Sequence, residues 1–127
     1  MERHVTVLGI LSSVWGALAA LVGLSLLLLA AGALAILAGP DGEAVEFYAG
    51  LTAGTFAASG IFVLLWGGAH LWAGLLLRRR QAAGRILALA LAVVNLLVLP
   101  FGTALGIYAF WVLLTHDGRR LFEPAAT

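Results

Sequence analysis

Leu64–Arg80, with the sequence LLWGGAHLWAGLLLRRR, ends a long apolar run with three consecutive arginines. The apolar part starts at about Phe47 and reaches Leu77 without a charged residue. This run exceeds the roughly 20 residues that a helix needs to cross the hydrocarbon core of a membrane. Arginines that flank such a run are typical of its cytoplasmic end. The stretch therefore predicts a membrane-spanning helix whose C-terminal end faces the cytoplasm.

The composition of the whole chain agrees with a membrane environment. The chain has 127 residues, of which 63% are hydrophobic and 10% charged, whereas about a quarter of the residues of a soluble domain are charged. Cysteine is absent, which excludes disulfides, thiolate metal sites and cysteine nucleophiles. All seven basic residues are arginine. With the Ala, Leu and Gly bias, this suggests a GC-rich bacterial genome, so we expect a bacterial plasma membrane.

Four apolar runs predict one all-α domain over residues 1–127, an integral membrane four-helix bundle. Its N-terminal hairpin is long and its C-terminal hairpin shorter, with helices at about 5–38, 45–77, 82–99 and 103–120. Turn-forming residues separate the runs at Gly39–Glu43 and Pro100–Gly102. The apolar core of the first run is far longer than the usual 7 to 15 or so residues of a signal peptide, which favours a retained helix over a cleaved leader.

The distribution of arginines predicts the orientation of these helices. If the N-terminus is cytoplasmic, all seven arginines lie inside, as the positive-inside rule requires, and the C-terminus is cytoplasmic too. Phe47 and Tyr48 then anchor the outer interface. The clustered arginines are expected to set this topology and to contact anionic lipid headgroups. They are Arg78, Arg79, Arg80, Arg85, Arg119 and Arg120.

Small residues recur every seven positions in both long runs, a pattern we call the glycine ladder. The residues are Gly9, Gly16, Gly23 and Ala30 in the first run, and Ala53, Gly60, Gly67 and Gly74 in the second. An antiparallel hairpin pairs Gly9 with Gly74, Gly16 with Gly67, Gly23 with Gly60, and Ala30 with Ala53. Because small residues let helix backbones approach in lipid, the pattern predicts a tight hairpin seam. The same stripe is also suited to packing between subunits.

His70 is the one titratable side chain near neutral pH that lies well inside the apolar runs. Its position between Gly67 and Gly74 puts it on the predicted seam, at the height of Ser13. We therefore expect a hydrogen bond between His70 and Ser13. The alternative is a proton relay or a metal ligand, since ionisable groups inside a membrane are functional candidates. No second histidine or carboxylate lies within the runs, so no metal or cofactor is predicted.

Two further polar side chains lie in the second pair of runs. Asn95 and Tyr108 are at similar distances from the Pro100–Gly102 turn, so they are expected to pair across the second hairpin. Thr52, Thr55 and Ser59 add polarity to the outer half of the second run. They either line an outer vestibule or bond to their own backbone.

The segment VNLLVLPFGTALGIYAFWVLL (Val94–Leu114) resembles the C-terminal hairpin of small bacterial four-helix membrane proteins that have no assigned activity. The resemblance covers roughly a sixth of the chain, and it implies a four-helix membrane fold and nothing about chemistry. In that hairpin, Pro100 and Gly102 are expected to form the turn, and Thr103 to cap the last helix.

These patterns predict a non-enzymatic, multi-pass membrane protein that acts by packing or as an accessory subunit. Its expected partners are the lipid bilayer, a second copy of itself or another membrane protein, and not nucleic acid. The alternative is a channel or transporter subunit for ions or small solutes, which would need an oligomer because four helices are too few for a roomy pore. No catalytic residues are predicted, because the sequence has no phosphate loop, paired carboxylates or nucleophile elbow.

Overall fold

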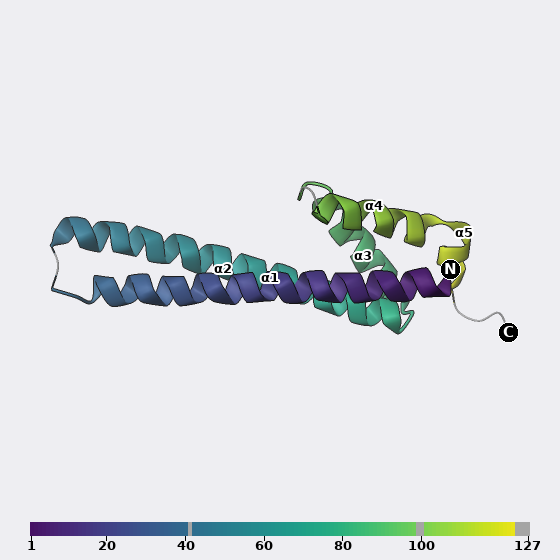
Figure 1. Ribbon diagram of the computed structural model, residues 1–127, viewed down its shortest axis with the longest axis horizontal. Coiled ribbons are helices and arrows are strands. Elements are labelled where there is room, and N and C mark those ends of the chain that lie inside the picture. The colour runs from purple at the N-terminus through teal and green to yellow at the C-terminus, as the bar shows by residue number, and fades with distance from the viewer. Residues whose placement is uncertain (41, 99–100, 124–127) are drawn as a thin grey trace. The chain divides into compact units, whose positions relative to one another are not determined.

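The structure is a computed structural model that describes residues 1–40, 42–98 and 101–123. It is all-helical, as predicted, and the described residues contain no β-strand. The described residues form five helices, which are α1 (Glu2–Leu37), α2 (Glu43–Arg78), α3 (Ala82–Asn95), α4 (Phe101–Leu114) and α5 (His116–Arg120) (Figure 1).

The C-terminal part differs from the four predicted helices. The third helix ends at Asn95 and the fourth at Leu114, earlier than expected. The prediction that the fourth helix continues to Arg120 is wrong. Thr115 interrupts it with an extended backbone (φ −64°, ψ 152°), and its side chain accepts a hydrogen bond from the amide of Gly118. A short separate helix, α5, therefore starts after Thr115.

Helix length separates the first two helices from the next two. α1 and α2 have 36 residues each, which corresponds to about 54 Å, and both are long and apolar enough to cross a membrane. α3 and α4 have 14 residues each. At about 21 Å apiece, they are shorter than the roughly 30 Å of a hydrocarbon core.

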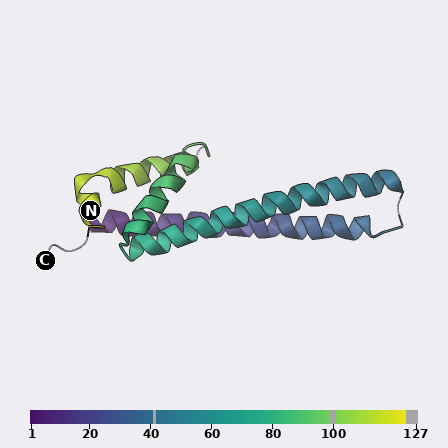
Figure 2. The same cartoon turned by 180° about the vertical axis from the view of Figure 1, so that it is seen from behind.

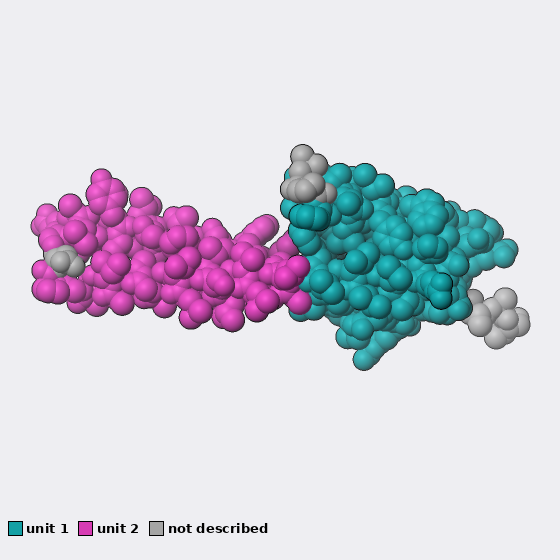
Figure 3. Space-filling model, in the orientation of Figure 1, with its two compact units in different colours: residues 1–16, 69–127 teal, residues 17–68 magenta. Residues whose placement is uncertain are grey.

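The chain divides into two compact units (Figure 3). Unit 2 is residues 17–68, two antiparallel helical segments joined by the turn between α1 and α2. Every buried residue among its described residues is glycine or alanine, while large apolar side chains such as Phe62 and Leu65 are 66% and 70% exposed. The buried set is Gly23, Ala30, Ala33, Ala49, Ala53, Gly60 and Gly67.

Unit 1 comprises residues 1–16 and 69–127 and has a conventional core of larger side chains. Leu8, Leu77 and Leu113, from three different helices, are completely buried. α3 and α4 lie side by side in both views (Figures 1 and 2). They approach closely at Gly106, where an added Cβ would be 2.9 Å from the carbonyl oxygen of Ala92. The other members of the core are Val5, Ala88, Ala92, Ala109, Val112 and Phe122.

The turn between α3 and α4 differs from the prediction. Gly102 lies inside α4 and not in the turn, and Pro100 is outside the described residues. Thr103 is the third residue of α4 and does not cap it. Its hydroxyl donates instead to the carbonyl oxygen of Leu96 (2.9 Å). This hydrogen bond joins the start of α4 to the residue that follows α3.

The turn between α2 and α3 depends on one residue in an unusual conformation. Arg80 has a φ of 54°, in the left-handed region. Its amide bonds to the carbonyl oxygen of Leu77 (3.0 Å), and the amide of Gln81 bonds to that of Leu76 (3.1 Å). This hydrogen-bond pattern is a Schellman motif, which usually has glycine at the left-handed position.

Candidate functional site

A buried polar pair joins α2 to the end of α3. Nδ2 of Asn95 lies 2.9 Å from Nε2 of His70, and both residues are almost completely buried, at 2% and 1% exposed. An amide nitrogen is only a donor, so in this arrangement Nε2 accepts and the imidazole proton is on Nδ1. The predicted partner, Ser13, uses its hydroxyl proton elsewhere, in a bond to the carbonyl oxygen of Gly9 (2.9 Å). The bond predicted between His70 and Ser13 stays a prediction, whereas the contact of His70 with Asn95 was not predicted from the sequence.

The other half of the Asn95 amide is less well satisfied. Its Oδ1 is buried and has no hydrogen-bond partner among the described residues. A buried acceptor without a partner usually costs about 1–3 kcal/mol. The Asn95 amide is therefore satisfied on one side only.

Tyr108 lies against the start of α1 and does not pair with Asn95 as predicted. Its hydroxyl is 3.0 Å from Nδ1 of His4. The imidazole of His4 also packs edge-on against Trp111, with ring centroids 5.1 Å apart, and Tyr108 and Trp111 stack at 6.0 Å. His4 lies outside the apolar runs, and hydropathy and spacing within those runs therefore did not predict this cluster.

The predicted arginine cluster has several different contacts. The side chain of Arg78 folds back towards α1, where Nη2 donates weakly to Oγ of Ser13 (3.4 Å). Arg80 forms an ion pair with Glu2 at 2.9 Å, and both side chains are largely exposed. Arg79 and Arg120 are exposed.

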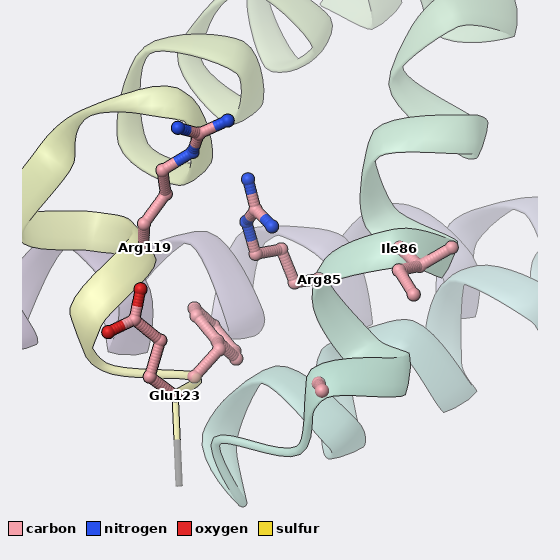
Figure 4. Close-up of a pocket in the computed structure, with 6 residues that line it drawn as sticks. Arg85, Ile86, Arg119 and Glu123 are labelled. Atoms are coloured by element: carbon pink, nitrogen blue, oxygen red, sulfur yellow. The ribbon is translucent and has the colours of Figure 1, made fainter. Parts of the chain in front are cut away.

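Arg85 and Arg119 line the same pocket on unit 1, with a volume of about 250 Å³. The side chains extend from α3 and α5, and their guanidinium groups point in the same direction (Figure 4). Nε of Arg85 donates to the carbonyl oxygen of Leu113 (3.0 Å), which holds this side chain in place. The full lining is Ala82, Arg85, Ile86, Arg119, Phe122 and Glu123.

The glycines predicted for the helix seam make close backbone contacts in each unit. In unit 1, an added Cβ on Gly9 would be 3.0 Å from the carbonyl oxygen of Gly74. In unit 2, Cβ atoms added to Gly23 or Gly60 would each be 2.9 Å from the other residue's carbonyl oxygen. The remaining predicted seam residues, Gly16, Ala30, Ala53 and Gly67, are buried.

Among residues 1–40, 42–98 and 101–123, no three histidine, aspartate or glutamate side chains lie close enough together to hold a metal ion. Comparisons of the chain with known protein families, curated proteins and solved structures found no match. The buried His70–Asn95 pair and the two-arginine pocket are therefore the candidate sites that the geometry itself provides.

Proposed function

We propose that this chain is a multi-pass protein of the bacterial plasma membrane, with both termini cytoplasmic, which acts by packing against other membrane helices and not by catalysis. The observation that carries the proposal is the burial pattern of unit 2. Among the described residues of this unit, those that are buried are all glycine or alanine, and the leucines and phenylalanines are exposed or half-buried. A water-soluble domain buries its large apolar side chains instead.

Lipid explains this pattern physically. Hydrocarbon is as apolar as leucine, so exposed leucines cost nothing there, and helices associate where small residues let their backbones approach. The close contacts of Gly9 with Gly74 and of Gly23 with Gly60 support the proposal that the glycine ladder is the seam of the first hairpin. The arginine distribution supports the orientation.

Other small residues are left open for a second helix. Gly50 and Gly54 lie four residues apart on α2, the spacing that is common where membrane helices cross closely. An added Cβ on either residue would meet nothing within 4 Å. These open glycines favour self-association or an accessory role beside another membrane protein.

Self-association in lipid tests the proposal. We expect energy transfer between donor- and acceptor-labelled copies in liposomes, in proportion to the protein-to-lipid ratio. The double substitution Gly50→Leu with Gly54→Leu should weaken association several-fold, because leucine side chains hold the backbones apart. Leu65→Ala, a change of an exposed residue on the same helix, is the control. A chain that stays monomeric at every ratio would overturn the self-association proposal.

A channel or transporter subunit is the second candidate. The buried His70–Asn95 pair favours it, because polar side chains inside a membrane often mark a solute or proton path. The measurement is ion or solute flux into proteoliposomes. Flux that His70→Ala leaves unchanged would exclude a path through His70.

A further inference from the structure

The pocket between α3 and α5 combines charge with an apolar wall. Arg85 and Arg119 supply two positive charges, and Glu123 supplies one negative charge. Two guanidinium charges less one carboxylate leave a net charge of +1, which matches one phosphodiester monoanion. Arginine is well suited to such a group, because its planar fork donates two parallel hydrogen bonds to phosphate oxygens.

An exposed apolar stripe begins at this pocket and continues along α3. Ile86 lines the pocket, and Ala90, Val93 and Leu97 follow it at spacings of four, three and four residues, which places them on one side of the chain. Ile86, Val93 and Leu97 are 68%, 57% and 82% exposed. Within α3, the stripe from Ile86 to Val93 is about 10 Å long, and Leu97 lies two residues beyond the end of the helix.

We propose that this pocket binds one anionic phospholipid of the cytoplasmic leaflet. Its phosphate lies between the guanidinium groups of Arg85 and Arg119, and an acyl chain lies along the stripe that starts at Ile86. The bond from Arg85 to the carbonyl oxygen of Leu113 positions one guanidinium before the lipid arrives. The proposal rests on the membrane location given under Proposed function.

Native mass spectrometry of the full chain in detergent tests the site, with dipalmitoyl phosphatidylglycerol as the probe. Arg85→Gln with Arg119→Gln should lower its apparent affinity at least about tenfold, because the charge-assisted hydrogen bonds to the phosphate are lost. Arg3→Gln with Arg79→Gln, an equal loss of two charges at exposed residues outside the pocket, should leave the affinity within about twofold. Equal losses in the two variants would overturn the site.

Two further arms separate this lipid from other ligands and from loss of folding. Excess inorganic phosphate should not displace the lipid, and dihexanoyl phosphatidylglycerol should bind more weakly than the long-chain lipid. Displacement by phosphate, or equal binding of both chain lengths, would overturn the lipid assignment. If the double variant does not fold, the single variant Arg119→Gln tests the site. The side chain of Arg119 makes no hydrogen bond within the described part of the chain, so this substitution removes no such bond from the folded protein. If the protein is stable in detergent but binds no phosphatidylglycerol, the lipid site is rejected. That result does not affect the proposed membrane location.

A separate observation concerns the far end of the hairpin formed by α3 and α4. Both helices are about 21 Å long, and arginines lie at the base, before α3 and after α4. The turn has no charged residue, and Leu97 and Phe101 beside it are 82% and 73% exposed. Turns that emerge into water are usually polar.

Three backbone amides among the described residues beside this turn are hydrogen-bonded within the hairpin. The amide groups of Leu97 and Val98 bond to the carbonyl oxygens of Val94 and Asn95, both at 3.0 Å, and the amide of Thr103 bonds to that of Val98 (2.9 Å). Internal hydrogen bonding of this kind is what backbone in hydrocarbon requires. We infer that α3 and α4 form a re-entrant hairpin, which enters the bilayer from the arginine side and turns back inside it.

Cysteine labelling tests the hairpin, because the natural chain contains no cysteine. A membrane-impermeant maleimide is added to intact spheroplasts and to inverted vesicles carrying Gly42→Cys, Gln81→Cys or Leu97→Cys. We expect Gly42→Cys to react from outside, Gln81→Cys from inside, and Leu97→Cys from neither side until detergent is added. Reaction of Leu97→Cys from outside, with both controls as expected, would reject the hairpin alone. Controls that react from the wrong sides would reject the topology given under Proposed function.

Discussion

The side-chain amide of Asn95 lies 2.9 Å from Nε2 of His70, across 25 positions of sequence, and both residues are almost completely buried. The contact joins the final residue of α3 to the C-terminal third of α2. Apolar side chains pack in many orientations at similar cost, whereas a buried hydrogen bond is lost in all but one of them. The pair therefore specifies how α3 is rotated against α2.

Removing either partner should reveal this coupling. We expect the double-mutant cycle of His70→Ala and Asn95→Ala to give an interaction energy of about 0.5–2 kcal/mol, the range for hydrogen bonds between membrane helices. The measurement is reversible unfolding in mixed detergent micelles. Thr55→Ala paired with Asn95→Ala is the control cycle, because Thr55 is exposed and bonds only to its own helix. A coupling no larger than in the control would contradict the assigned role.

The His70–Asn95 pair shows which contacts can be predicted from the sequence and which cannot. Counting from the turn places Gly9 near Gly74, because an antiparallel hairpin of two long helices has one dominant register. The same count assigned Ser13 to His70. It did not identify Asn95, because this partner of the imidazole lies on a third helix, α3. Neither the tilt nor the rotation of α3 follows from the spacing of residues in α1 and α2.

Glycine-to-alanine substitutions along α2 should divide into two opposite classes. Gly74→Ala puts a Cβ against Oγ of Ser13 and 2.6 Å from the carbonyl oxygen of Gly9, so we expect a loss of about 1–3 kcal/mol in unfolding free energy. Gly54→Ala and Gly68→Ala meet nothing within 4 Å. They should raise stability by roughly 0.5–1 kcal/mol through helix propensity.

Detergent unfolding of the three variants compares these classes directly. Each variant adds one methyl group to a glycine of α2, so the intrinsic effect of a glycine-to-alanine substitution is common to all three. If Gly74→Ala and Gly68→Ala shift the midpoint equally and in the same direction, the close approach of the two helices at Gly74 is refuted.

Two substitutions of Tyr108 separate the contribution of its hydrogen bond to His4 from the contribution of its ring packing. Tyr108→Phe removes the 3.0 Å bond to Nδ1 of His4 and keeps the ring that stacks on Trp111. We expect a loss of about 0.5–1.5 kcal/mol, and about 3–5 kcal/mol for Tyr108→Ala, which also empties the ring site. Unfolding free energies measure both. Equal losses would mean that the ring contributes nothing beyond its hydroxyl.

The lengths of α3 and α4 mark another limit of sequence reasoning. An apolar run gives an upper bound for a helix, and both runs are long enough to suggest near-complete spans. Each helix is shorter because polar side chains act on the local backbone. The hydroxyl of Thr103 closes the turn by bonding to Leu96, and Thr115 starts a new helix by accepting from Gly118. Such choices depend on single hydrogen bonds that hydropathy does not register.

Because the backbone of Arg80 is left-handed, we expect glycine to be more stable than alanine at this position. At φ 54°, a residue with a Cβ carries roughly 1–2 kcal/mol of strain that glycine avoids. Arg80→Gly should therefore be more stable than Arg80→Ala by about 1 kcal/mol, since both lose the ion pair with Glu2 and only alanine keeps the strain. At Arg79, whose amide bonds to the carbonyl oxygen of Leu75 as in a helix, the order should reverse. The four unfolding free energies test this, and the same order at both positions would show that Arg80 is not strained. Glu2→Gln should cost less than about 1 kcal/mol, because the ion pair is exposed, and so the strain outweighs the contact that Arg80 makes.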